Sequence, residues 1–439
     1  MGTVTLFSLA FPMFLENIIP KFINTVNTSL LSNYSETAVA AIGTAGTAMG
    51  LVYTLSSVIG TGSTVVISNY IGRDNREKIY EATFSSIAFC VGFGIISSVF
   101  LTIFSEKMLG FMNLKGETYE IALYYFKYLS KIYFISATVS ALLAVMRCFG
   151  YPKYTVFISV GSGLLNMGLV FYFLYFPKYA PVTGIKGLCV AQFTGTMASL
   201  VASIIIFRKI GIKIKVPSSV KNLFVYMWKM VKIGFPTAIS NCSVTVSSIV
   251  TTSFIAFIGT YALSARTYYD SLLSYAYLFS MIVGCANALL TGRLCGAKKY
   301  DEARRMNRSL VKITMAVNLS VSVLLFALRA PLLSLFTKNQ QIIYLSFGIF
   351  LIDIITEQAR AVSQIYEYSL RAAGDITVIM VVTVISCWVF AVGLSYLLSI
   401  KCGLGLIGCY IGVALDEVTR TVVSLIRWRQ NKWTKKLVI

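Results

Sequence analysis

Charged and amide side chains recur along an otherwise apolar stretch near the end of this 439-residue chain. Steps of four, three, four, three and four residues separate Asp353, Glu357, Arg360, Gln364, Glu367 and Arg371. A helix places such positions on one face, over roughly 27 Å at about 1.5 Å per residue. That length is close to the thickness of the hydrocarbon core of a bilayer. The stripe therefore predicts a polar interior, either a sealed ion-pair network or a water-filled path.

Further acids and arginines lie on two other apolar stretches: Arg266 and Asp270 on the first, and Asp416, Glu417 and Arg420 on the second. Two interpretations stay open for this charged group. Acids and arginines in near balance form a fixed network that holds a helix bundle together. Alternatively, the network takes up and releases a cation. Glu357 and Arg360 lie deepest in the stripe, so Glu357 is our candidate for the group that binds this cation. The candidates for a substrate cavity in this half are Arg266, Asp270, Arg360 and Gln364.

The elements that position these residues are membrane helices. The chain is 57% hydrophobic and only 13% charged, which is outside the range of soluble domains. Its apolar runs number about twelve, each long enough to span a bilayer, and they lack the alternation of membrane strands. We therefore expect an all-α integral membrane protein with about twelve transmembrane helices.

The net charge of +21 suggests nucleic acid in a soluble protein, but its distribution argues against that interpretation. The basic residues gather at alternate ends of the apolar runs, which predicts that both termini are cytoplasmic. Nine cysteines without a CxxC pair, and the lack of histidine, make a disulfide framework or a metal site unexpected. The N-terminus lacks the basic region and cleavage site of a signal peptide, so its first apolar run is expected to be retained.

The chain divides into two halves around a basic connection. We expect an N-terminal six-helix bundle at residues 1–208, a C-terminal bundle at residues 232–430 and a basic cytoplasmic tail at residues 431–439. The connection at residues 209–231 is rich in lysine and predicts an amphipathic helix on the inner leaflet. Prolines inside the apolar runs predict helix kinks at Pro12, Pro20 and Pro236.

The second half repeats the first at a constant offset in residue number. Four pairs of landmarks share an offset of 224 (236 − 12, 296 − 72, 371 − 147, 374 − 150): Pro12 and Pro236, Gly72 and Gly296, Arg147 and Arg371, Gly150 and Gly374. Each half holds an even number of spans, so both halves have the same orientation in the membrane. Such a parallel repeat predicts two pseudo-symmetric bundles with a substrate site between them.

Several segments in order along the chain resemble the multidrug and toxic compound extrusion (MATE) transporters. They are LAFPMFLENI, VNTSLL, AVAAIGTAG, GTGSTVVISNYIGRDNREK, KIGFPTAIS and LRAAGDI. The resemblance covers essentially the whole chain. It implies two six-helix bundles, alternating access, and export of small organic, drug-like and cationic compounds against inward H⁺ or Na⁺, with no other cofactor. It also implies a monomer in the plasma membrane of a prokaryote.

Two positions depart from the family's coupling-cation pattern. Many members carry an aspartate in the first span where this chain has Asn27, and another where it has Val170; the family's asparagine is matched by Asn166. Glu16 is the natural substitute, because it lies eleven residues before Asn27 and shares its helix face. The same strip carries three candidate cavity residues: Asn17, Lys21 and Asn24. A permanent charge pair of Glu16 with Lys21 is the structural alternative.

Three other function classes are weighed against an exporter. A flippase for a lipid-linked saccharide would use Lys21, Arg266 and Arg360 for an anionic headgroup. A net basic cavity would favour that flippase, and an acid-lined apolar cavity would favour drug cations. A receptor or channel fits two pseudo-symmetric halves poorly. No nucleophile, base and metal constellation indicates an enzyme.

Overall fold

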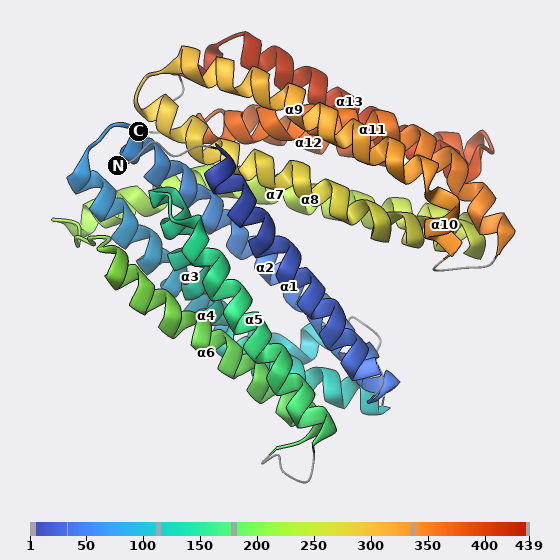
Figure 1. The fold of residues 1–439 in the computed structure, drawn as a ribbon, viewed down its shortest axis with the longest axis horizontal. Coiled ribbons are helices and arrows are strands. Elements are labelled where there is room, and N and C mark those ends of the chain that lie inside the picture. The colour runs from blue at the N-terminus through green and yellow to red at the C-terminus, as the bar shows by residue number, and fades with distance from the viewer. Residues whose placement is uncertain (1–5, 33, 111–115, 177–181, 335–338, 436–439) are drawn as a thin grey trace. The chain divides into compact units, whose positions relative to one another are not determined.

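The computed structural model describes residues 6–32, 34–110, 116–176, 182–334 and 339–435, which are helical with short turns and contain no strand. The first half forms α1 (Leu6–Ser32), α2 (Glu36–Gly72), α3 (Arg76–Gly110), α4 (Gly116–Phe149), α5 (Pro152–Tyr175) and α6 (Gly184–Ile210) (Figure 1). The second half forms α7 (Val220–Ile258), α8 (Thr260–Gly296), α9 (Tyr300–Ala327), the short α10 (Arg329–Ser334), α11 (Gln340–Ala372), α12 (Ile376–Ser386) and α13 (Gly405–Arg429). The predicted all-α fold is confirmed.

Helix α12 continues through two π-helical segments, η1 (Cys387–Leu394) and η2 (Leu397–Lys401), and a 3-10 turn, η3 (Lys432–Lys435), follows α13. By length and composition, nine helices of the described chain suffice to cross a membrane. The three prolines expected to kink helices lie inside α1 and α7, which run on through them.

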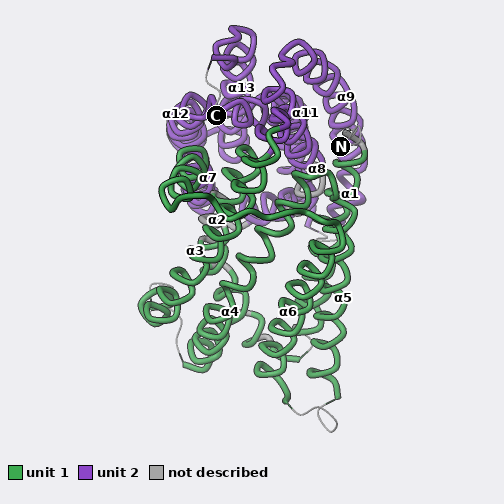
Figure 2. Tube along the Cα trace, turned by 90° about the vertical axis from the view of Figure 1, so that its left-hand side faces the viewer, with its two compact units in different colours: residues 1–67, 75–234 green, residues 68–74, 235–439 purple. Residues whose placement is uncertain are grey.

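The chain forms two compact units (Figure 2). The N-unit comprises residues 1–67 and 75–234, and the C-unit comprises residues 68–74 and 235–439. The end of α2 therefore belongs to the C-unit, and the first turns of α7 belong to the N-unit. The expected linker at residues 209–231 overlaps α7, whose first turns carry the exposed Phe224 and Trp228.

Turns at the helix ends repeat with the predicted spacing. Gly150 and Gly374 follow α4 and α11 with φ angles of 89° and 87°, a left-handed conformation that favours glycine. The N–H of Gly150 donates to the carbonyl of Arg147 at 3.0 Å, and that of Gly374 donates to the carbonyl of Arg371 at 3.1 Å. Both partners are related by the offset of 224 (374 − 150, 371 − 147), so the repeat is one of structure as well as sequence.

A close crossing of α2 and α8 inside the C-unit explains the glycine pair Gly72 and Gly296. A Cβ at Gly72 would lie 2.0 Å from the carbonyl oxygen of Arg293, and one at Gly296 would lie 2.1 Å from that of Asn69. Asn69 and Arg293 are themselves related by the offset of 224 (293 − 69). The two glycines thus let the two backbones touch through related positions.

The spacing changes at the last helix of each half. Gly184, Gly187 and Ser203 of α6 match Gly405, Gly408 and Ser424 of α13 at an offset of 221 (405 − 184, 408 − 187, 424 − 203). Residues 152–183 span α5 and its following connection, and residues 376–404 span the related stretch of the second half. The second stretch is three residues shorter (32 against 29), which accounts for the change.

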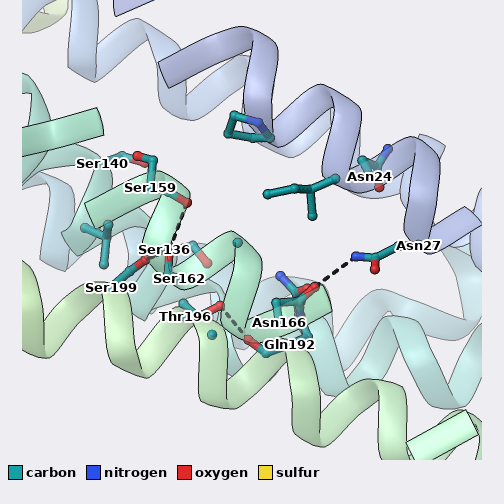
Figure 3. A pocket seen from close by; sticks show the side chains of 15 residues that line it. Asn24, Asn27, Ser136, Ser140, Ser159, Ser162, Asn166, Gln192, Thr196 and Ser199 are labelled. Carbon is teal, nitrogen blue, oxygen red and sulfur yellow. Dashed lines mark hydrogen bonds between the residues drawn. The ribbon is translucent and has the colours of Figure 1, made fainter. Parts of the chain in front are cut away.

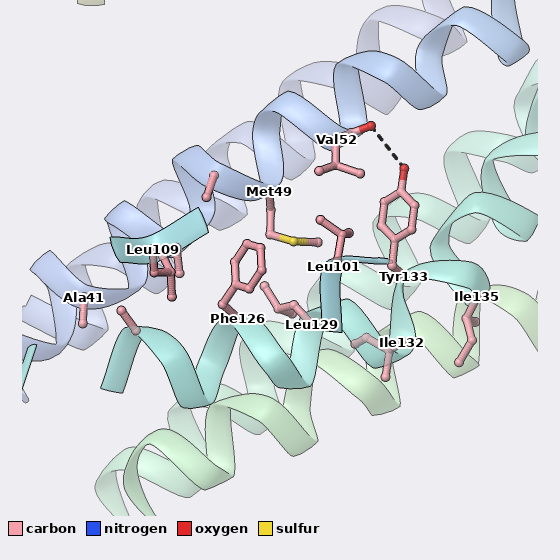
Figure 4. Close-up of a cluster of buried hydrophobic side chains, with 13 residues drawn as sticks. Ala41, Met49, Val52, Leu101, Leu109, Phe126, Leu129, Ile132, Tyr133 and Ile135 are labelled. Carbon is pink, nitrogen blue, oxygen red and sulfur yellow. Dashed lines mark hydrogen bonds between the residues drawn. The ribbon is translucent and has the colours of Figure 1, made fainter. Parts of the chain in front are cut away.

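Apolar packing holds the N-unit helices together. Leu101 of α3 and Phe126 of α4 pack against Met49 of α2, and all three side chains are buried (Figure 4). Tyr133 joins this cluster with its ring and donates its hydroxyl hydrogen to the carbonyl of Val52 at 3.2 Å. The hydroxyl is thereby satisfied inside the cluster.

Candidate functional site

Four carboxylates and two guanidiniums meet between α11 and α13 of the C-unit. We call Asp353, Glu357, Arg360, Asp416, Glu417 and Arg420 the C-unit network. Arg360 contacts Glu357 on its own helix and reaches Glu417 on α13 at 3.2 Å. Arg420 lies 2.7 Å from Glu417 and 3.0 Å from Asp416. One row of alternating charges therefore connects the two helices.

Neighbouring helices add neutral partners to the C-unit network. Tyr269 of α8 donates its hydroxyl hydrogen to Asp353. Asn318 of α9 donates to the backbone oxygen of Glu357 at 3.2 Å and to its carboxylate at 3.4 Å. The hydroxyl of Ser386 donates to Asp416 at 2.5 Å. These contacts hold the carboxylates in place from three further helices.

The charges of the C-unit network do not balance. Four carboxylates face two guanidiniums, which gives a formal charge of −2 when all six groups are ionised (2 − 4). The four carboxylates and Arg420 are buried, with Glu357 at 0% exposure. Unbalanced charge that is buried is costly, and a proton or another cation removes the cost. The network is thus chemically suited to hold a cation.

The rest of the α11 stripe consists of one balanced ion pair and the neutral Gln364. Glu367 binds Arg371 at 3.1 Å on the same helix. Outside the stripe, Arg266 binds Asp270 at 3.3 Å and also donates to the hydroxyl of Ser248 at 3.2 Å. Gln364 is partly buried on α11. The structure therefore joins Glu357 and Arg360 in one network and leaves Arg266 and Asp270 as a separate pair.

A cavity of about 370 Å³ lies inside the N-unit (Figure 3). Ten of its fifteen lining residues carry hydroxyls or amides: Asn24, Asn27, Ser136, Ser140, Ser159, Ser162, Asn166, Gln192, Thr196 and Ser199. The other five are Pro20, Ile23, Val139, Gly163 and Gly195. We call this hollow the N-unit cavity. No charged residue is among those described as lining it, so it offers hydrogen bonds without a formal charge.

The polar groups of the N-unit cavity form short chains. Asn27 of α1 donates to the side-chain oxygen of Asn166 on α5 at 3.0 Å (Figure 3). Asn166 in turn donates to Gln192 of α6 at 3.3 Å. The hydroxyl of Ser199 donates to that of Ser162 at 2.6 Å. Three helices thus present a set of oriented donors and acceptors around the hollow.

The N-unit cavity and the C-unit network occupy related positions of the repeat. On the fourth span of each half, Ser136 corresponds to Arg360 (360 − 136 = 224). On the last span, Thr196 corresponds to Glu417 and Ser199 to Arg420, at the offset of 221 (417 − 196, 420 − 199). Long charged side chains fill the site in one unit, and short hydroxyl side chains leave it hollow in the other.

Glu16 lies in a separate polar contact of the N-unit. Its carboxylate binds Arg147 at 2.6 Å and accepts a hydrogen bond from Thr155 at 2.6 Å. The ion-pair partner is therefore Arg147 of α4, whereas the sequence suggested Lys21. Asn17 is exposed and donates to the backbone of Met13 at 2.7 Å. Of the predicted residues on α1, the structure brings Asn24 and Asn27 to the cavity.

The sequence analysis did not identify the serines of the N-unit cavity, Gln192 or Thr196 as candidate site residues. The available signal was the repeat itself, because three of these positions correspond to charged residues of the second half. It also missed Tyr269 and Asn318 as partners of the C-unit network. Their contacts join helices that are far apart in the sequence, and no local pattern indicates them.

Comparison with known proteins defines the family to which the chain belongs. A sequence model of the MatE family matches residues 12–172 and again residues 236–397, and the starts of these two matches differ by the offset of the repeat (236 − 12 = 224). The chain therefore belongs to the MatE family, and the resemblance to MATE transporters is confirmed.

Two relatives align with nearly the whole chain. The "Uncharacterized transporter YisQ" of Bacillus subtilis is 30% identical over 440 residues, which cover 99% of this chain and 96% of the relative. The "Probable multidrug resistance protein NorM" of Thermotoga maritima is 24% identical, with 99% and 94% covered. A solved structure described as "MATE in the bent conformation" superimposes with a TM-score of 0.88 at 17% identity, covering 97% of this chain and 94% of the other. The protein is thus a multi-pass membrane transporter with the MATE fold.

Proposed function

We propose that this transporter exports small organic compounds across the plasma membrane of a prokaryote in exchange for protons, with both termini in the cytoplasm. The observation that carries the proposal is the buried excess of two carboxylates in the C-unit network. A protein that must carry a cation inward needs a buried site that is stable in two charge states. Among the described ion pairs, those outside the network join single acids to single bases and offer no such excess.

Glu357 is the residue that we propose takes up the proton. Its carboxylate lies between the guanidinium of Arg360 and the amide of Asn318. Protonation would remove one of the two carboxylates that Arg360 contacts, so α11 and α13 would be bound differently in the two charge states. A proton needs only one carboxylate oxygen, whereas an alkali cation would need several oxygen ligands beside the guanidiniums of Arg360 and Arg420, which supports H⁺ rather than Na⁺.

The N-unit cavity is our candidate contact site for the exported compound. Its hydroxyls and amides suit a compound that carries hydrogen-bonding groups. The lining is neither basic, as a site for an anionic lipid headgroup would be, nor acid-lined. The Thermotoga maritima relative is named as a multidrug resistance protein, and no feature of the cavity favours the flippase.

Transport by the purified protein in proteoliposomes tests this function. Efflux of a fluorescent organic cation, and of a neutral polar compound, is measured under an imposed pH gradient and then under a sodium gradient. We expect the pH gradient to drive efflux in the wild type and in Glu106→Gln, which alters an exposed acid of α3 paired with Lys127. Glu357→Gln should lower this efflux by at least about tenfold, within the range of usual coupling free energies.

Two results would contradict the proposal. Efflux driven by the sodium gradient alone would show that Na⁺, and not H⁺, is the coupling ion. Unchanged pH-driven efflux in Glu357→Gln would remove the C-unit network from coupling.

A further inference from the structure

A second hollow, of about 380 Å³, lies in the C-unit and takes no part in the function proposed above. We call it the arginine pocket, and its lining residues are Arg304, Arg308, Tyr366, Trp428, Arg429 and Asn431. They come from the start of α9, from α11, and from the end of α13 with the turn that follows. Three of the six are arginines, and no acid is among the described lining residues.

The aromatic wall of the arginine pocket is firmly built. The rings of Trp428 and Trp433 stack at 4.1 Å with only 7° between their planes. The indole N–H of Trp433 donates to the carbonyl of Trp428 at 2.9 Å, and the edge of Tyr300 packs on Trp433. Trp433 is fully buried, although the sequence suggested a basic tail from residue 431 onwards. The turn after α13 is therefore a structural part of the pocket.

Several donors that line the pocket have no partner. Arg308 and Arg429 are exposed at the mouth of the hollow, and they form no ion pair or hydrogen bond within the described part of the chain. Arg304, by contrast, binds Asp301 at 2.5 Å and Asn431 at 3.0 Å, which fixes the turn after α13. Only 5% of Tyr366 is exposed, and its hydroxyl has no hydrogen-bond partner among the described residues. The hydroxyl of Tyr366 is therefore available to a ligand in the hollow.

The repeat supplies an internal control for this pocket. Arg304 and Arg308 correspond to Tyr80 and Phe84 of α3 at the offset of 224 (304 − 80, 308 − 84). Tyr366 corresponds to Leu142 of α4 (366 − 142). On the last span, Arg429 corresponds to Arg208 at the offset of 221 (429 − 208), so only Arg304 and Arg308 lack a basic counterpart in the N-unit. The repeated fold alone does not require Arg304 and Arg308, so these two arginines are a feature specific to the C-unit.

We propose that the arginine pocket binds a phosphate-bearing anion. Two free guanidiniums match the oxygens of a phosphate, and the hydroxyl of Tyr366 adds a third donor. The neighbouring rings of Trp428 and Tyr366 form an apolar wall for the group that carries the phosphate. The pocket lies at helix ends that we expect to face the cytoplasm, where anionic phospholipid headgroups are present. A lipid headgroup and a free phosphate ester share the chemistry that these residues recognise.

Binding to the purified full-length protein tests the proposal. Native mass spectrometry counts bound phosphatidylglycerol, and thermal unfolding is followed with added glycerol 3-phosphate. Phosphatidylcholine, a zwitterion without net charge, is the comparison. The variants are Arg308→Gln/Arg429→Gln and Tyr366→Phe. The matched control is Arg305→Gln, which alters an exposed arginine on the same turn of α9 that is not among the lining residues.

We expect the double variant to lose about tenfold or more in apparent affinity, as befits the loss of charge-assisted hydrogen bonds. Tyr366→Phe should lose a smaller factor and Arg305→Gln none. Preference for phosphatidylglycerol would identify a lipid ligand, and preference for glycerol 3-phosphate a soluble one. Equal binding by Arg305→Gln and the double variant, or no preference for either anion over phosphatidylcholine, would overturn the proposal. If the double variant does not fold, the comparison of Tyr366→Phe with Arg305→Gln decides the question.

Discussion

The two units use the same positions of one repeated scaffold for opposite purposes. In the C-unit, Arg360, Glu417 and Arg420 fill the space between the fourth and the last span with buried charge. In the N-unit, their counterparts are short hydroxyl residues that line a hollow of about 370 Å³. The difference shows that one repeated scaffold can hold a charged site in one half and a neutral cavity in the other. A coupling site and a ligand site in different units would then communicate through conformation.

The largest expected contrast is in stability, at the related positions Arg420 and Ser199. Arg420→Ala leaves Asp416 buried without its ion-pair partner and leaves Glu417 with Arg360 alone, which costs about 3–5 kcal/mol. At about 2–4 °C per kcal/mol for a unit of this size, the melting temperature should fall by roughly 10 °C. Ser199→Ala removes one hydrogen bond, worth about 1 kcal/mol. Similar losses in the two variants, measured by thermal unfolding in detergent, would mean that the C-unit charges are not energetically linked.

A smaller effect is expected at Glu16, the charged contact of the N-unit. Glu16→Gln keeps the size of the side chain but removes the negative charge beside Arg147, for an expected cost of about 1–2 kcal/mol. Because the pair is balanced, pH-driven efflux should persist once the lower stability is allowed for. The same substitution at the exposed Glu106 should cost less than about 1 kcal/mol. Loss of pH-driven efflux in Glu16→Gln at unchanged protein levels would move the coupling site to the N-unit.

A larger side chain placed in the N-unit cavity tests whether the exported compound contacts it. Ser140→Leu places an apolar side chain in the hollow, and Thr138→Leu, two residues away on α4, alters a residue that is not among those lining it. We expect Ser140→Leu to raise the substrate concentration for half-maximal export by about tenfold, or about 1.4 kcal/mol. The pH dependence of transport should stay the same. A half-maximal concentration equal to that of Thr138→Leu would show that the compound does not contact this cavity.

Helical periodicity and the repeat were sufficient to predict much of the fold from the sequence. The stripe from Asp353 to Arg371 does lie in one helix, and all six of its polar side chains are buried or partly buried. The pairs at Gly150 and Gly374 are held by equivalent hydrogen bonds, because one turn geometry requires glycine in both halves. These signals depend on neighbours within a few turns or on a constant offset, which a sequence displays directly.

Contacts between distant helices could not be predicted in this way. Glu16 and Arg147 are 131 residues apart, and nothing near Glu16 distinguishes this partner from Lys21. Serines are common in membrane helices, so Ser136 and Ser162 carry no signal of a cavity until α4, α5 and α6 are packed. The sequence places Trp433 in a basic tail, and only the packed structure shows that it stacks on Trp428, which lines the arginine pocket.

Gradient-driven export and substrate exchange in Glu357→Gln, measured in the same proteoliposomes, test the central claim most directly. Exchange of labelled for unlabelled substrate needs the cavity and alternating access but no net movement of protons. We predict that exchange stays within about twofold of the wild type, while pH-driven export falls by at least about tenfold. Export driven by the pH gradient at the wild-type rate would contradict the assignment of proton coupling to the C-unit network.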